Sequence, residues 1–314
     1  DRFRARLGGS TPESAAAMEA DGLAEEDLAA LGARLINERA CLACHKLDDS
    51  DGKIAPDLSF QGLIRDETWL MEHFKNPRSL VSDSIMPTFR WPDTDFEAMT
   101  AHLLTRTEPP SFETAEEAYQ VFCARCHGEN GAGDGPAALY LDPSPRDLTK
   151  ASFMNSKPID RFLSAIRDGV PGTSMPPWKN VLNEERSQGV LDYVLDTFPT
   201  QPRRELKQRD LPETSPVAVS DESIARGEGI YLGRCTGCHG LKADGKGPNS
   251  PDMLPRPRNL RNSEFINSIN DRRMLESILY GIQGTAMPPW LDYGYSNNDA
   301  GDLVNYIRSL NTRR

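Results

Sequence analysis

The six cysteines of this 314-residue chain fall into three pairs, and this pattern constrains its structure more than any other feature. In each pair two residues separate the cysteines, and a histidine directly follows the second cysteine. The three segments are Cys41-Leu-Ala-Cys44-His45, Cys123-Ala-Arg-Cys126-His127 and Cys235-Thr-Gly-Cys238-His239. Two thiols at this spacing can add to the two vinyl groups of a porphyrin while the adjacent imidazole reaches its iron. The pattern therefore predicts covalent haem attachment, three times in one chain.

Other uses of paired cysteines fit less well. A zinc site needs four ligands, commonly from two such pairs. A thioredoxin-like redox pair has no required histidine and is expected beside a strand–helix–strand unit. Structural disulfides give no reason for a histidine after every pair. Because the three motifs use every cysteine, haem attachment is favoured and no thiol remains for thiol catalysis.

The chain also repeats itself in one register. Each motif is followed by a proline and, 30 residues after that proline, by a methionine that precedes another proline. The three pairs are Pro56 with Met86, Pro145 with Met175, and Pro257 with Met287. Repeats two and three share a seven-residue insertion after the histidine, and its glycine-rich loop lies at 131–136 and 243–248. Such a loop can cradle phosphate. Neither copy has the strand and lysine of a nucleotide site, so we expect a turn-rich loop over a haem edge.

This order of motifs resembles the class I cytochrome c domain, three times over, from about residue 23 to 314. The resemblance implies an all-α fold of three tandem cytochrome c-like domains, each wrapped around one covalently bound haem. The expected organisation is a polar N-terminal extension at 1–22, domains at 23–108, 113–199 and 219–314, and a linker at 200–218. Apolar spacing agrees with this class. It predicts helices at 25–39, 115–121 and 224–232 before the motifs, and at 95–105, 184–198 and 299–310 after the methionines. Asp93, Asn183 and Ser296 are candidate N-caps of the latter group.

The resemblance also assigns the iron ligands. The proximal ligands are His45, His127 and His239, and the distal ligands are Met86, Met175 and Met287. Thioether sulfur is a neutral, soft ligand, so His/Met ligation raises the reduction potential relative to two histidines and leaves no open position on the iron. Pro56, Pro145 and Pro257 are expected to offer backbone carbonyls to the second ring nitrogen of the proximal histidines. Arg146 and Arg258 are expected to pair with haem propionates, or alternatively to form surface salt bridges.

Two histidines and four methionines have other expected roles. His73, on a predicted helix at 67–75, is the rival of Met86, and would make the first haem a low-potential centre with two histidines. His102 occupies the place in its closing helix that Tyr193 and Tyr306 hold in the other repeats, and we interpret it as a packing residue. The same interpretation applies to Met71, Met99, Met154 and Met274.

The charge and hydropathy of the chain limit the classes of partner that it can bind. The net charge of −11 argues against nucleic acid, which needs a basic surface. It suits a redox partner with a basic docking face, although negative charge also keeps a chain soluble. No stretch of the sequence approaches the ~18 apolar residues of a membrane span. Two basic segments are notable. The run of Arg203, Arg204, Lys207 and Arg209 is a docking patch or a solvated linker, and Arg2, Arg4 and Arg6 would fit the end of a lost N-terminal anchor or signal peptide.

These features predict an electron-transfer protein rather than an enzyme. Covalent haem attachment takes place outside the cytoplasm, so the resemblance implies the periplasm or the periplasmic face of a membrane. The expected partners are redox proteins, among them a quinol-oxidising membrane complex or dehydrogenase and a terminal oxidase or reductase of a respiratory or photosynthetic chain. Two alternatives remain: a tightly bound subunit of a larger complex, and a peroxidase or reductase. The latter would need a repeat without its Met-Pro ligand, and all three repeats have one.

Overall fold

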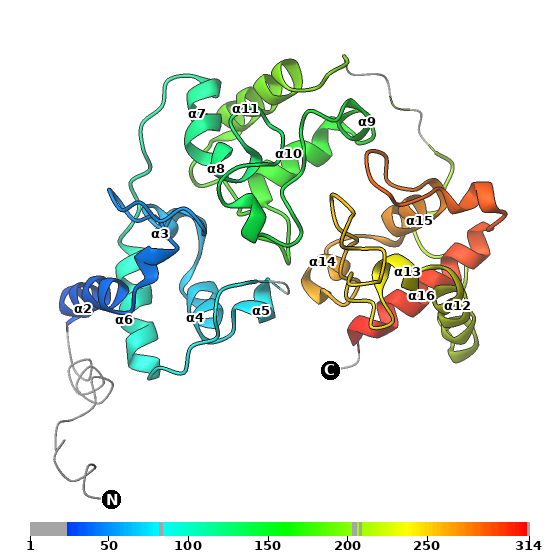
Figure 1. The fold of residues 1–314 in the computed structure, drawn as a ribbon, viewed down its shortest axis with the longest axis horizontal. Coiled ribbons are helices and arrows are strands. Elements are labelled where there is room, and N and C mark those ends of the chain that lie inside the picture. The colour runs from blue at the N-terminus through cyan, green and yellow to red at the C-terminus, as the bar shows by residue number, and fades with distance from the viewer. Residues whose placement is uncertain (1–23, 82–83, 203–205, 207–208, 313–314) are drawn as a thin grey trace, which may run out of the picture. The chain divides into compact units, whose positions relative to one another are not determined.

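The computed structural model describes residues 24–81, 84–202, 206 and 209–312. In these ranges every regular element is a helix, so the predicted all-α class is confirmed (Figure 1). The extension at 1–22, including Arg2, Arg4 and Arg6, lies outside the described residues. So do Arg203, Arg204 and Lys207 of the basic run.

The described residues form two compact units. Unit 1 takes in the chain up to Leu80 and from Ile85 to Ser111, and unit 2 takes in Val81, Ser84 and the chain from Phe112 onward. Unit 1 therefore corresponds to the first sequence repeat, and unit 2 holds repeats two and three. No helix in the described ranges is long and apolar enough to cross a membrane.

Unit 1 is built on a close crossing of its first and last helices. Its elements are α2 (Glu25–Glu38), η2 (Cys41–Ala43), α3 (Gln61–Ile64), α4 (Glu67–Lys75), α5 (Pro77–Leu80) and α6 (Asp93–Leu104). A Cβ added at Gly32 of α2 would lie 1.9 Å from the backbone oxygen of Ala98 and 2.9 Å from the Cβ of His102. His102 therefore packs at the crossing, as the sequence predicted. Met99, on the same helix, is fully buried in the core.

The second repeat uses the same plan with a shorter first helix. Its elements are α7 (Ala115–Phe122), α8 (Ala124–His127), η3 (Ala138–Tyr140), α9 (Ala151–Met154), α10 (Ile159–Asp168) and α11 (Glu184–Thr197). A capping box between Thr114 and Glu117 starts α7, because each side chain satisfies a backbone N–H that the first turn leaves without a partner. The buried ring of Tyr119 packs on Tyr193 of α11, with 5.7 Å between centroids.

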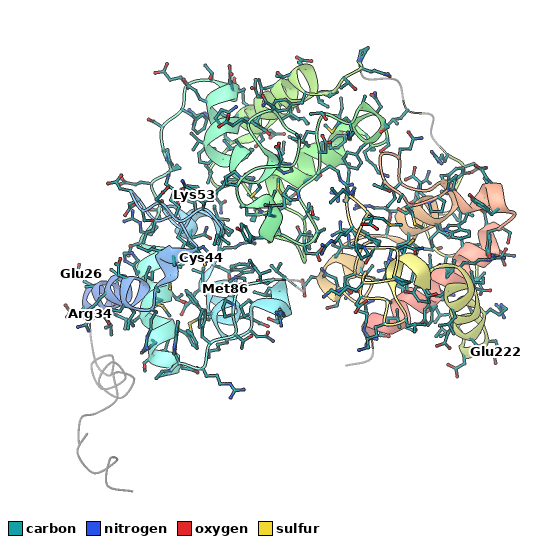
Figure 2. All side chains as sticks on the ribbon, viewed as in Figure 1. Glu26, Arg34, Cys44, Lys53, Met86 and Glu222 are labelled. Atoms are coloured by element: carbon teal, nitrogen blue, oxygen red, sulfur yellow. The ribbon has the colours of Figure 1, made fainter. Side chains whose placement is uncertain are left out.

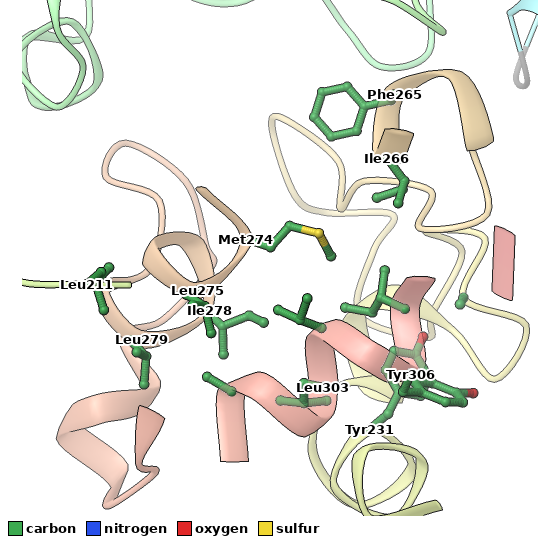
Figure 3. Close-up of a cluster of buried hydrophobic side chains, with 14 residues drawn as sticks. Leu211, Tyr231, Phe265, Ile266, Met274, Leu275, Ile278, Leu279, Leu303 and Tyr306 are labelled. Atoms are coloured by element: carbon green, nitrogen blue, oxygen red, sulfur yellow. The ribbon is translucent and has the colours of Figure 1, made fainter. Parts of the chain in front are cut away.

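The third repeat has the largest apolar core, drawn in Figure 3. Its elements are α12 (Asp221–Arg234), α13 (Thr236–His239), α14 (Ser263–Asn267), α15 (Asp271–Tyr280), η4 (Trp290–Tyr293) and α16 (Asn297–Thr312). Helices α12 and α16 cross at Gly227, where a Cβ would lie 2.1 Å from the Asp302 backbone oxygen. Beside the crossing the buried carboxylate of Asp302 accepts hydrogen bonds from Ser223 (2.6 Å) and Arg226 (2.7 Å), which removes the cost of burying its charge.

The predicted helices are confirmed. The helix at 67–75 has its predicted ends, and the other six differ from theirs by one to three residues at one or both ends. Helix α12 begins three residues before the predicted start, because Ser220 caps it and accepts a bond from the Ser223 N–H. Asp93 is not an N-cap: it is the first residue of α6, after Pro92, and its carboxylate pairs with Lys75 at 2.7 Å. Asn183 and Ser296 do accept bonds from backbone N–H groups at the starts of α11 and α16.

Candidate haem sites

Each cysteine–histidine motif sits where the first helix of its repeat ends. Helix α7 is capped by Cys123 and α12 by Cys235, and the one-turn helices α8 and α13 follow directly. The N–H of His127 donates to the carbonyl of Cys123 at 2.9 Å, and His239 makes the same bond to Cys235 at 2.8 Å. One helical turn therefore places two thiols and an imidazole on the same side of the backbone. In unit 1 η2 takes this role after Ala40, whose φ of 58° breaks the helix.

The thiols of the three motifs are free. All six cysteines are unpaired with one another. Burial raises the pKa of Cys123 to about 12 and that of Cys235 to about 11, because the thiolate would lose its hydration. Within the described ranges no three His, Cys, Asp or Glu side chains gather as a metal site would need. This environment suits addition of thiols to an apolar group better than it suits a zinc–thiolate centre.

A backbone carbonyl anchors the ring of each motif histidine. Nδ1 of His45 donates to the Pro56 carbonyl at 2.9 Å. Nδ1 of His127 donates to Arg146 at 3.0 Å, and Nδ1 of His239 donates to Arg258 at 2.9 Å. Because a carbonyl only accepts, Nδ1 carries the hydrogen and Nε2 keeps the lone pair that can ligate iron.

The carbonyls of Pro145 and Pro257 do not take the role that the sequence assigned to them. Repeats two and three have one more residue between the proline and the following leucine, so the acceptor moves to the residue after the proline. The proline carbonyls instead face the glycine-rich loops. A Cβ at Gly133 would lie 2.8 Å from the Pro145 oxygen, and one at Gly245 would lie 2.4 Å from the Pro257 oxygen.

The backbone N–H groups of the glycine-rich loops donate hydrogen bonds to backbone carbonyls of the attachment motifs. Gly133 donates to the carbonyl of His127 at 2.8 Å, and Gly245 donates to that of His239 at 2.9 Å. Gly135 and Gly247 likewise donate to the carbonyls of the second cysteines, at 3.3 and 3.1 Å. The loops therefore fold over the attachment motif and do not offer a phosphate cradle, as the sequence context indicated.

The methionines that the sequence assigns as distal ligands in repeats two and three lie in matching loops. The N–H of Met175 donates to Thr173 Oγ1 at 3.2 Å, and the N–H of Met287 donates to Thr285 Oγ1 at 3.1 Å. Each methionine carbonyl accepts a bond from the residue five positions earlier, Val170 or Ile282. These hydrogen bonds hold the loop backbone on both sides of each methionine, and so they fix the position of its Cα.

Unit 1 presents both of its candidate distal ligands. Met86 is half-buried against the same core cluster as Cys41 and Leu58 (Met86 and Cys44 are labelled in Figure 2). His73 stacks on Trp69 with 4.4 Å between ring centroids, and its Nδ1 is buried without a hydrogen-bond partner. Burial and the neighbouring charges of His45 and Arg65 lower the pKa of His73 to about 4, which keeps the ring neutral. A neutral imidazole is the form that ligates a metal.

The arginines after the two prolines suit an anionic cofactor. Arg146 lies 4.3 Å over the ring of Phe153, and Arg258 lies 4.0 Å over that of Phe265. Nη1 of Arg146 is buried without a hydrogen-bond partner, and burial lowers the pKa of Arg146 to about 10. A buried guanidinium is costly unless an anion pairs with it. A haem propionate beside the anchored His127 would supply that anion, so the residues present fit haem c.

All-helical repeats with paired thiols and carbonyl-anchored histidines define a c-type cytochrome, a class of haem proteins that transfer electrons. A family model described as cytochrome c oxidase, cbb3-type, subunit III matches residues 110–194 and 222–307, more than half of the chain. The chain belongs to this family. A second model, described as cytochrome c oxidase, mono-heme subunit/FixO, matches residues 50–114. The covalently bound haem c that the sequence predicted is therefore the cofactor of these domains.

Known relatives are similar over parts of the chain. Cytochrome c55X of Paracoccus denitrificans is 31% identical over 75 residues, which cover 24% of this chain and 63% of that protein. Cytochrome c55X of Stutzerimonas stutzeri is 32% identical over 78 residues, which cover 24% and 59%. The chain thus spans less than two thirds of the length of these relatives. Among solved structures, a chain of the reducing HAO-like protein complex of Kuenenia stuttgartiensis matches with a TM-score of 0.50 and 25% identity, over 65% of this chain and 100% of that one.

Proposed function

We propose that the chain is a tri-haem c-type cytochrome of the periplasm that carries electrons from a quinol-oxidising complex or a dehydrogenase to an acceptor oxidase or reductase. The observation that supports this is the threefold repetition of one arrangement. In each copy a free thiol pair lies at a helix end, and the next residue is a histidine whose Nδ1–H donates to a backbone carbonyl. Haem c supplies an iron that accepts and releases one electron.

The residues of the chain would hold the haem and orient its histidine ligand. The two thiols of each motif hold the porphyrin edge, and the carbonyl bond fixes the tautomer and orientation of the proximal histidine. Met175 and Met287, on loops held by threonine hydrogen bonds, would be the second protein ligands of the irons in repeats two and three. An iron held by both a histidine and a methionine would have no open position for peroxide or another oxidant, which favours electron transfer over haem catalysis.

The first haem is proposed to have Met86 as its distal ligand, with His73 as the alternative. The two give different ferric spectra, because methionine sulfur produces a long-wavelength charge-transfer band that a second histidine does not. Replacement of Met86 by alanine should remove that band from one haem in three, and His73→Ala should leave it. The reverse result would assign His73 instead.

The central test is the number of haems per chain. Protein expressed with the c-type haem maturation machinery should carry three, by haemochrome assay and intact mass. Replacing Cys123 and Cys126 by alanine should reduce the number to two, while the chain keeps the haems of the other repeats. Wild-type protein that binds fewer than three haems would contradict the proposal.

A second candidate, a bound subunit of a larger complex, is favoured by two of the comparisons. The matching family model is described as an oxidase subunit, and the similar solved structure is a chain of a protein complex. Size-exclusion chromatography of native membrane extracts separates the candidates. A freely diffusing carrier elutes alone, and a subunit elutes with its partners.

A further inference from the structure

Repeats two and three of unit 2 contact each other through two loops in equivalent positions. Gly172 and Gly284 each lie three residues before the distal methionine, and both have positive φ, 67° and 74°. Nδ2 of Asn262, the N-cap of α14, donates to the Gly172 carbonyl at 2.6 Å. In return, a Cβ at Gly284 would lie 3.0 Å from the Cβ of Phe153, on α9. Each repeat therefore packs its distal loop on the equivalent short helix of the other.

The same helices carry arginines. Arg146 lies over Phe153, the residue that the Gly284 loop contacts. Arg258 lies over Phe265, with Arg273 at 5.7 Å from the same ring. The N–H of Phe265 donates to Oδ1 of Asn262 at 3.0 Å, which ties that ring to the contact with the Gly172 loop. The arginines therefore lie at the contact between the repeats.

Charges from both repeats act on one another there. Burial and, to a smaller extent, the charges of Arg161, Arg258 and Arg146 together lower the pKa of Arg273 to about 10. Arg161 and Arg273 hold the third position of α10 and α15, so the four arginines are two equivalent pairs. We call Arg146, Arg161, Arg258 and Arg273 the arginine cluster.

Among the described residues, Glu276 is an acidic neighbour of the arginine cluster. The carboxylate of Glu276 raises the pKa of both Lys157 and Arg273, against the burial and the neighbouring cations that lower it. The carboxylate of Glu276 also lies 3.6 Å from Nε of Arg209, so several cations share it. In a chain with a net charge of −11, such a concentration of partly buried cations calls for bound anions.

We propose that the arginine cluster is one shared site for the propionate carboxylates of the haems of repeats two and three, so that the two haems form an electrostatically coupled pair. The inference rests on the proposed function, because it needs both haems in place. An electron on either haem then changes the electrostatic potential at the other through a region with little water. In unit 1, Trp69 holds the third position of α4, so the first haem lacks the matching arginine.

Arg161→Gln and Arg273→Gln test this in the haem-loaded protein by spectroelectrochemical titration. The haems are assigned by EPR and by comparison with the Met175→Ala and Met287→Ala proteins. Each arginine variant should lower the midpoint potentials of both haem two and haem three, since a cation that favours reduction is lost from a shared site. The expected change is about threefold in the reduced-to-oxidised ratio at fixed potential, or about 30 mV at 59 mV per tenfold. The potential of haem one should not change.

The control is Arg261→Gln, which removes one exposed positive charge from the third repeat outside the cluster. The proposal is overturned if each variant shifts only the haem of its own repeat, or if the control shifts both haems equally. It is also overturned if inorganic phosphate, added at constant ionic strength, shifts both potentials in the wild type but not in Arg273→Gln, because the cluster would then hold a free anion. The haem count of each variant, measured separately, reports on the proposed function itself.

Discussion

Alanine at position 227 should weaken the third repeat, whereas alanine two residues further along the same helix should strengthen it. At Gly227 a Cβ would lie 2.1 Å from the backbone oxygen of Asp302 and 2.8 Å from the Cβ of Tyr306. At Gly229 it would meet nothing within 4 Å. Both changes should add about 0.5–1 kcal/mol to the free energy of unfolding through the backbone alone, because glycine loses more backbone freedom in a helix than alanine does.

Only Gly227→Ala must also push two helices apart. Overpacking a tight contact costs about 1–3 kcal/mol, and the upper end applies because the atoms that would be met are mostly backbone. The net loss for Gly227→Ala is then about 2 kcal/mol, and the two variants should differ by about 3 kcal/mol. For a unit of the size of unit 2, each kcal/mol shifts the melting midpoint by about 2–4 °C, so the two variants should melt about 6–12 °C apart.

Calorimetry and circular dichroism of the haem-loaded chain measure this difference, and the haem count shows that both variants mature. The reasoning is refuted if Gly227→Ala melts at or above the wild type. It is also refuted if Gly229→Ala loses as much stability as Gly227→Ala.

Three further predictions follow from single contacts. Tyr231→Phe should cost about 1 kcal/mol in denaturant unfolding, since its buried hydroxyl donates to the Gly240 carbonyl at 2.6 Å. The exposed Tyr293→Phe should cost little, and equal losses would contradict this. Met287→Ala should remove the methionine–iron band of one haem and lower its potential while three haems stay attached, and an unchanged spectrum would show that Met287 is not a ligand. The pKa of Asp302 is lowered, because the bonds from Arg226 and Ser223 outweigh the burial that raises it. Its stabilisation is therefore present above the ordinary pKa of an aspartate and lost as the pH falls through the lower folded value. In Asp302→Asn the acid dependence of the melting temperature should be weaker, and an identical pH profile would exclude this role.

The predicted all-α class is correct because helix formation depends mainly on residues that are close together in the sequence. Helix periodicity and caps such as Asn183 depend on neighbouring residues, so the helix ends fall close to the expected ones. The exception at Asp93 arises because its carboxylate pairs with Lys75, 18 residues away, while Pro92 precedes the helix. The sequence alone does not distinguish Gly227 from Gly229. The difference between them is that α16 packs against Gly227 and not against Gly229.

The sequence by itself determined that three porphyrin attachment motifs recur in one register, because attachment needs only two thiols and an imidazole within five consecutive residues. The tertiary structure alone decided which carbonyl orients His127, since Arg146 lies 19 residues away. It also brought Asn262 to Gly172, 90 residues apart, and with them the arginines of two repeats. Contacts over such separations depend on how whole helices pack, and no local pattern in the chain encodes them.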